Sequence, residues 1–416
     1  MNTYITAVAF AIPVFIILIS IEWILSIRRG IIVNHPADMI SSLSSGLTNI
    51  LKDGLKISFA LISYDWLVNK ISIVKFDSLI LTVFIAFVVK DFAGYWLHRM
   101  NHRINILWNR HIIHHSSEEF NLSCALRQSI SGVISFGAIF LIPAALFGVP
   151  TWLFAIMGPI HLFLQFWYHT RLIENMGFLE HILVTPSHHR VHHAINPEYI
   201  DKNYSQIFII WDKMFGTFQE ELKNVPPVYG ILRPAKTWNP ILINFKHFFT
   251  LLSDAFKTKN WKDKLKLWFM PTGFRPFDVA TKNPIKTIEK AEELNKYITK
   301  NSTLQFVWGY FQLAFTLGLI FHLFNLENQF DSLYLYLYAG IIFTNIFSFT
   351  SLLDNSKLVY ISEIIKISLI GIILWQLNFH WFDLQDIGTG VFIAFQIIGI
   401  IIINLTIIKL PNPNLT

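Results

Sequence analysis

The chain has 416 residues, a net charge of +6 and a mean hydropathy of +0.47. Only 14% of the residues are charged, against about a quarter in a soluble domain. With 53% hydrophobic residues, this predicts an all-α, polytopic membrane protein. The single cysteine, Cys124, excludes a disulfide framework and a thiolate metal site. Membrane topology explains the basic residues, so no nucleic-acid partner is expected.

Long apolar stretches predict membrane-spanning helices along most of the chain. They lie near residues 5–26, 76–96, 130–148, 151–168, 304–325, 333–352, 357–376 and 387–408. A further stretch, 46–69, contains Lys52, Asp53, Lys56 and Asp65, and is either a polar spanning helix or a re-entrant segment. Very short connections predict that 130–168 and 304–352 each form an antiparallel hairpin.

The distribution of Lys and Arg predicts the orientation of these spans. Basic residues are frequent in 97–129 and 171–303, whereas the connections 326–332 and 378–386 contain none. Because basic loops favour the cytoplasmic side, nine crossings with an outer N-terminus place both basic segments in the cytoplasm. Eight crossings, with 46–69 re-entrant, would break this agreement on one side. We therefore expect about nine spans and a cytoplasmic, histidine-rich cap.

Twelve of the sixteen histidines lie between residues 98 and 193, and most belong to three short clusters. Their spacings of three and four residues place imidazoles on one face of a helix. Imidazole is a common ligand of transition metals, and so many imidazoles exceed what one ion needs. The pattern therefore predicts two neighbouring metals, and all-nitrogen ligation suits an oxygen-activating diiron centre. The clusters are His98-x3-His102, His111-Ile-Ile-His114-His115 and His189-Arg-Val-His192-His193.

The sequence around these clusters resembles the fatty acid hydroxylase/sterol desaturase superfamily of membrane diiron enzymes. Within it, the alkylglycerol monooxygenase family is the most similar. The resemblance covers about residues 90–220 and rests on five stretches. They are Asp91-Phe-Ala-Gly-Tyr-Trp-Leu-His98-Arg-Met-Asn-His102, Trp108-Asn-Arg-His111-Ile-Ile-His114-His115, Asn121-Leu-Ser-Cys-Ala-Leu-Arg127, Gln165-Phe-Trp-Tyr-His169 and Thr185-Pro-Ser-His188-His189-Arg-Val-His192-His193, which continues to Trp211-Asp212.

The resemblance implies a set of iron ligands and of residues around them. The implied ligands are His98, His102, His111, His114, His115, His189, His192 and His193, with His169 as a ninth. Gln165 stands where related hydroxylases have another histidine, and His188 is the alternative to His189 in a shifted register. Asp91 would orient a ligand imidazole or pair with Lys90. Asp201 and Asn203 are further candidates for contacts around the ligands.

The same resemblance implies the activity. It is an O2-dependent monooxygenase that hydroxylates a lipid C–H bond next to an ether oxygen, so that an alkylglycerol is cleaved to a fatty aldehyde and a glycerol derivative. Its cofactors would be two iron ions and tetrahydrobiopterin, with an electron-donor protein as an alternative. The chain departs from the animal members at Arg103, where they carry an acidic residue, and this bears on pterin use.

Other interpretations remain open from the sequence. The enzyme could hydroxylate or desaturate a sterol, a carotenoid or an acyl chain. A metal transporter is also compatible with many histidines, but its ligands would lie near the middle of the bilayer. Lone histidines, such as His247 and His322, are interpreted as structural. The bias toward Ile, Lys, Asn and Phe is typical of an AT-rich bacterial genome and predicts a bacterial inner membrane.

The chain is expected to have four regions. N-terminal spans occupy residues 1–75, the histidine-rich diiron core 76–220, a cytoplasmic or interfacial segment 221–303, and C-terminal spans 304–416. Within the third region, 241–256 and 261–269 are amphipathic, which predicts helices that lie along the membrane interface.

Overall fold

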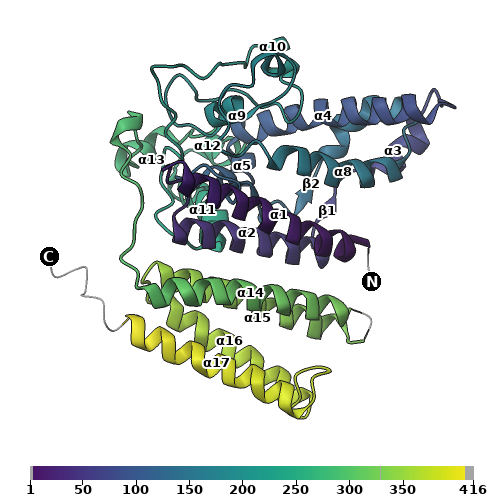
Figure 1. Ribbon diagram of the computed structural model, residues 1–416. Coiled ribbons are helices and arrows are strands. Elements are labelled where there is room, and N and C mark those ends of the chain that lie inside the picture. Colours follow the sequence, from purple (N-terminus) through teal and green to yellow (C-terminus); the bar gives the residue numbers. More distant parts are fainter. Residues whose placement is uncertain (1–2, 328, 408–416) are drawn as a thin grey trace.

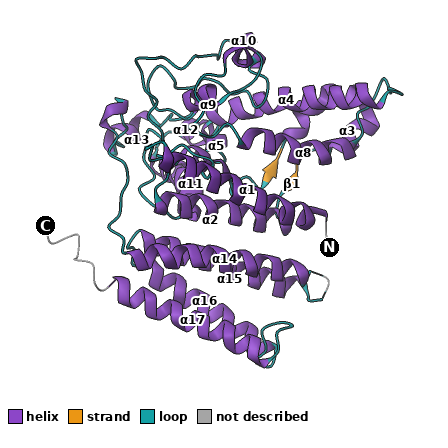
Figure 2. Ribbon diagram, viewed as in Figure 1, coloured by secondary structure: helices purple, strands orange, loops and turns teal. Residues whose placement is uncertain are grey.

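A computed structural model describes residues 3–327 and 329–407 of the chain. Almost all its regular structure is helical, with one short parallel pair of strands (Figure 2). The N-terminal part contains α1 (Thr3–Arg28), α2 (Pro36–Gly54), β1 (Phe59–Ala60), α3 (Tyr64–Ile71) and α4 (Leu79–Arg103). After it come α5 (Asn105–Trp108), α6 (Ile112–His115), η1 (Cys124–Leu126), β2 (Ile134–Ser135), η2 (Gly137–Leu141), α7 (Ile142–Leu146) and α8 (Thr151–Phe166).

Short helices and long loops form the middle of the chain, and four long helices end it. The middle contains η3 (Gly177–His181), α9 (Pro186–His192), α10 (Ile210–Met214), α11 (Pro240–Lys257), α12 (Trp261–Lys266), α13 (Phe277–Lys282) and η4 (Ala291–Glu293). The last four are α14 (Thr303–Asn325), α15 (Ser332–Leu353), α16 (Leu358–Gln376) and α17 (Asp386–Ile407).

The long helices confirm an integral membrane protein. Among the described residues, six helices are long and apolar enough to cross a membrane: α1, α4 and α14 to α17. Two shorter apolar segments, Gly137–Leu146 and Thr151–Phe166, fall where further spans were expected. The number of spans therefore roughly fits the prediction, although the segment 130–148 is built from β2, η2 and α7 rather than from one helix.

The segment 46–69, which was expected to be either a polar spanning helix or a re-entrant segment, is not one continuous helix. α2 ends at Gly54, where a Cβ atom would clash with the Phe324 ring of α14. β1 then pairs with β2 before α3 begins. The ammonium group of Lys52 donates a hydrogen bond to the carbonyl oxygen of Ser129. Lys52 thus has its partner inside the protein, which is where irregular backbone at membrane depth is tolerated.

Figure 1 shows how these helices are arranged. α14 to α17 lie together on one side of α1 and α2, and α3, α4 and α8 lie on the other. α2 contacts α14, α15, α11 and η1, so it joins the C-terminal helices to the rest. The largest hydrophobic core lies at this junction and includes Ile40, Leu51, Ile342 and Trp381. α14 and α15 form the predicted hairpin, whereas α7 and α8 both pack on α3 and α4.

The short helices gather around the end of α4 that carries the histidines (Figure 1). α11 and α12 form where amphipathic helices were predicted. Large apolar side chains are exposed on these helices, at Phe256 and Trp261, and just after α12, at Phe269. This exposed apolar surface suits the membrane interface.

Candidate metal centre

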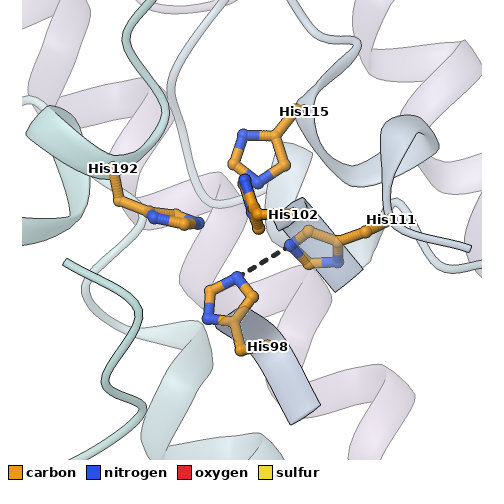
Figure 3. Close-up of side chains that lie close together, drawn as sticks. All are labelled: His98, His102, His111, His115 and His192. Carbon is orange, nitrogen blue, oxygen red and sulfur yellow. Dashed lines mark hydrogen bonds between the residues drawn. The ribbon is translucent and has the colours of Figure 1, made fainter. Parts of the chain in front are cut away.

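Five imidazoles converge at the end of α4 (Figure 3). We call them the five-histidine cluster: His98, His102, His111, His115 and His192. α4 supplies two of them at an i, i+4 spacing, the segment of α6 supplies two, and α9 supplies the fifth. One ring nitrogen of each lies within 4.8 Å of the others, which is close enough for all to face one ion.

Four further imidazoles form a neighbouring group, the four-histidine cluster: His114, His169, His189 and His193. His169 follows the end of α8 and joins residues from the second and third sequence motifs. The two clusters are adjacent, since the rings of His115 and His193 stack with centroids 4.3 Å apart. The nine histidines predicted from sequence therefore lie together in two clusters, and each cluster contains histidines from more than one sequence motif.

Backbone carbonyl groups fix the tautomers of several of these rings. The Nδ1 atom of His98 lies 2.7 Å from the carbonyl oxygen of Tyr204, and that of His192 lies 2.9 Å from the carbonyl oxygen of Lys202. In the other cluster, His169 Nδ1 lies 2.9 Å from the carbonyl oxygen of Gln165. A carbonyl only accepts, so each Nδ1 donates, and the Nε2 lone pair of the neutral ring points inward.

These inward nitrogens lack the partners that buried polar atoms normally have. The Nε2 atoms of His102, His115 and His192 are buried and have no hydrogen-bond partner among the described residues. The Nε2 atoms of His169 and His189 are only 2.8 Å apart. Crowded lone pairs without donors are costly to bury unless a cation lies between them.

Burial also keeps these rings neutral. It lowers the pKa of His111, His115 and His192 well below the usual value, and that of His169 to about 3. Neutral imidazole is the form that binds metals. Both clusters therefore fit the binding of non-haem iron, whose ligands include imidazole.

A buried ion pair supports the second histidine motif. Arg127 donates to Asp38 of α2 at 2.6 Å and to the hydroxyl of Ser116 at 2.6 Å, and its carbonyl oxygen lies 3.3 Å from His114 Nδ1. Arg127 and Asp38 are each no more than 2% exposed. The sequence drew no attention to Asp38, although an acidic residue beside an apolar region was a usable signal.

The loop 201–204 holds the carbonyls that orient His98 and His192. Asn203 has a positive φ of 55°, and its side chain donates to the carbonyl oxygens of His188 and Gln219. The carboxylate of Asp212 accepts hydrogen bonds from the backbone N–H groups of Tyr204 and Ser205. Asp201 accepts from Arg103 at 2.7 Å. These polar residues therefore act on the clustered imidazoles through the backbone of one loop.

The other residues predicted around the ligands have different partners. Asp91 contacts no imidazole of either cluster; it accepts hydrogen bonds from the backbone of Ile207 and Phe208 and from the Trp211 indole. It forms no ion pair with Lys90 among the described residues. Gln165 orients His169 with its backbone, while its side chain bonds to His161.

His188 lies outside both clusters. Its Nδ1 accepts a hydrogen bond from the backbone N–H of Thr185 and closes the capping box at the start of α9. The register in which His189 rather than His188 faces the other imidazoles is therefore the one that the structure adopts.

Comparisons with known proteins place this site in a family. The family model described as fatty acid hydroxylase matches residues 83–217, which include all nine clustered histidines. No solved structure matches the chain. A bacterial relative, ornithine lipid hydroxylase OlsE of Rhizobium tropici, is 29% identical over 182 residues, which is 44% of this chain and 52% of that protein.

Animal proteins are more similar. Alkylglycerol monooxygenase of Homo sapiens is 41% identical over 269 residues, or 64% of this chain, and the match spans only 59% of the human protein. The same enzyme of Xenopus tropicalis is 34% identical over 331 residues, covering 79% of this chain and 73% of the frog protein. With this coverage and nine converging histidines, the chain belongs to the alkylglycerol monooxygenase family.

Proposed function

We propose that this protein is a membrane diiron monooxygenase that cleaves ether lipids of the alkylglycerol type. The observation that carries the proposal is the pair of adjacent imidazole clusters. Three of their Nε2 atoms lack a partner among the described residues, and others, such as those of His169 and His189, face one another. The five-histidine cluster would hold one iron ion and the four-histidine cluster the other. Family membership supports the same assignment, since the relatives are named for this activity.

Two iron ions bound there would supply the activation of O2 for insertion of one oxygen atom into a C–H bond. The overall reaction balances when two electrons and two protons are added, so that the second oxygen atom leaves as water. Hydroxylation of the carbon beside the ether oxygen gives a hemiacetal, which separates into a fatty aldehyde and a glycerol derivative. We assign the two electrons to tetrahydrobiopterin, with an electron-donor protein as the alternative.

The position of the clusters supports an ether lipid over mid-chain chemistry. His98 and His102 lie in the last turns of the spanning helix α4, and His169 follows the end of α8. The metals would therefore lie near the membrane surface, at the depth of the carbon next to a glycerol head group. The protein's share is to hold that carbon beside the clusters and to exclude water.

The activity can be tested with membranes that contain the full chain. We expect 1-O-alkylglycerol, O2 and tetrahydrobiopterin to yield fatty aldehyde, with membranes from cells lacking the gene as the control. If no reductant supports aldehyde formation, while a sterol, carotenoid or acyl lipid gains a hydroxyl group, ether cleavage is the wrong assignment. Aldehyde formation only with a reduced cytochrome or ferredoxin would identify a protein donor instead of the pterin.

We further propose that the clusters face the cytoplasm of a bacterial cell. The distribution of basic residues supports this orientation. Asn260, which caps α12, is exposed and therefore a suitable labelling position. The native Cys124 gives little background, because it is only 1% exposed and burial raises its pKa to about 12. In a Cys124→Ser background, Asn260→Cys should react with an impermeant maleimide only after the membrane is opened. Labelling of intact cells at this position would reverse the topology.

A further inference from the structure

A cavity of about 320 Å³ adjoins the five-histidine cluster. Three cluster residues line it, namely His102, His115 and His192, and these are the three whose buried Nε2 atoms lack a partner among the described residues. Such a volume is at the lower end for ligand pockets, which span about 300–1,000 Å³. It therefore suits a small group that reaches the metal site, rather than a whole lipid with its alkyl chain.

The rest of the cavity wall comes from outside the long apolar helices. It includes Ile195 and Ile200 after α9, the loop 230–233, and Thr272 and Gly273. Only His102, in the last turn of α4, belongs to a candidate membrane span. Most of the cavity wall thus comes from segments outside the candidate membrane spans.

Arg233 is the unusual member of this wall. It is half-buried, and no hydrogen bond or ion pair joins its guanidinium group to any residue in 3–327 or 329–407. The nearby carboxylates are already paired: Asp254 binds Arg275 at 2.6 Å, and Asp201 binds Arg103 at 2.7 Å. The lining of this cavity therefore includes one arginine that is not paired with a carboxylate among the described residues.

We propose that this cavity binds a phosphate-bearing lipid head group and that Arg233 is the residue that recognises it. The inference rests on the proposed function and adds a substrate preference to it. A guanidinium group matches phosphate oxygens in a bidentate geometry, and a partly buried site strengthens the charge-assisted hydrogen bonds. Arg233 acts here as a specificity residue, since its partner is the head group and not the reacting carbon.

The test compares a neutral and a phosphate-bearing substrate. Fatty aldehyde is measured from 1-O-hexadecylglycerol and from 1-O-hexadecylglycerol 3-phosphate, with the full-length wild-type protein, Arg233→Gln and Arg233→Lys. Arg28→Gln is the matched control, because Arg28 is an exposed arginine at the end of α1 with no ion pair among the described residues. Arg28→Gln also removes one positive charge, but at a position outside the cavity lining.

Loss of a charge-assisted contact should raise KM for the phosphate lipid by about tenfold or more in Arg233→Gln. The neutral lipid should change little, kcat should stay close to that of the wild type, and Arg233→Lys should recover part of the loss. An equal effect of Arg233→Gln on both lipids, or the same effect from Arg28→Gln, would overturn the proposal.

Binding without turnover separates this inference from the proposed function. Labelled 1-O-hexadecylglycerol 3-phosphate is bound to purified protein in the absence of O2, and glycerol 3-phosphate and inorganic phosphate compete. Displacement by glycerol 3-phosphate that depends on Arg233 supports a head-group site, even if the wild type cleaves neither lipid. Displacement only by inorganic phosphate would assign the cavity to the free ion and contradict the proposal.

Discussion

At the scale of single residues, the protein separates histidines that are adjacent in sequence. His114 belongs to one cluster and His115 to the other, while His188 and His189 divide between a helix cap and the metal site. Two of these rings have backbone partners: His114 Nδ1 lies 3.3 Å from the carbonyl oxygen of Arg127, and His188 Nδ1 accepts from the N–H of Thr185. Such hydrogen bonds choose the tautomer and so decide whether a lone pair faces the metals.

His192→Ala should therefore remove one iron ion and abolish turnover. The variant loses a ring that lines the five-histidine cluster, and even partners outside the ligand shell are worth about 10–100-fold in metal affinity or activity. Metal analysis of the purified protein, together with the aldehyde assay, measures both effects.

His188→Gln is the matched control, since it changes a buried imidazole four residues away that lies outside both clusters. It should retain both ions, at the cost of a cap interaction worth about 1 kcal/mol. Equal metal loss in the two variants would contradict the division of the histidines described above.

At the scale of elements, one loop connects the third histidine motif to the first. The carbonyl oxygens of Lys202 and Tyr204 accept from imidazoles of α9 and α4. The carboxylate of Asp212 accepts a hydrogen bond from the backbone N–H of Tyr204 in this loop. The carboxylate of Asp91 accepts one from the backbone N–H of Ile207, which follows the loop. The arrangement of the imidazoles thus depends on polar residues that touch no histidine ring.

Asn203→Ala tests this dependence. Alanine loses two donated hydrogen bonds and adopts a φ of 55° less readily than asparagine does. We expect iron affinity to fall by about tenfold or more, as for other partners of metal ligands, while the protein still folds. Competition with a chelator of known affinity measures this change.

Asn355→Ala provides the control for backbone strain alone. Asn355 also has a positive φ, 53°, and makes two side-chain hydrogen bonds, but it lies between α15 and α16. Its substitution should lower the free energy of unfolding without changing iron affinity. If both variants lose iron equally, the loop has no specific role.

At the scale of the whole molecule, the C-terminal helices support the metal centre from a distance. Asp354, at the end of α15, accepts hydrogen bonds from the hydroxyls of Thr237 and Tyr297 and from the backbone N–H of Trp238, just before α11. α11 in turn packs on α6 and donates through His247 to the Asn105 carbonyl. This carboxylate is therefore one of the links between the last four helices and the part of the chain that carries the histidines, beside the packing of α2 on α14 and α15.

Asp354→Ala should destabilise the protein by about 1–3 kcal/mol, because it leaves a buried N–H group without an acceptor. Asp331→Ala, at the exposed opposite end of the same helix, where the side chain makes no cap hydrogen bond, should stay within about 0.5 kcal/mol of the wild type. Thermal unfolding in detergent compares the two. Similar stability of both variants would mean that the carboxylate does not couple the two parts.

The same residue predicts a pH dependence. Burial raises the pKa of Asp354 from 3.8 to about 6, so between these values the folded state binds a proton more readily than the unfolded state. The stability contributed by this group is therefore full below pH 3.8 and is lost as the pH rises through about 6. Asp354→Asn should remove this component from the pH profile of unfolding, and an unchanged profile would contradict it.

The sequence alone determined the membrane class and the nine histidines, because hydropathy and i, i+3 and i, i+4 spacing are local properties. It could not assign the rings to two sites, since that division depends on how α4, α6, α8 and α9 meet. It left the segment 46–69 open between a polar spanning helix and a re-entrant segment, because a group such as Lys52 finds its partner far away in sequence, at Ser129. Asp38 and Asp354 likewise have partners far away in sequence, at Arg127 and Trp238. Arg233 lines a cavity together with residues that are distant in sequence, such as His102 and Thr272. Only the tertiary structure decides these pairings, because charges and hydrogen bonds act over a few ångströms in space and not along the chain.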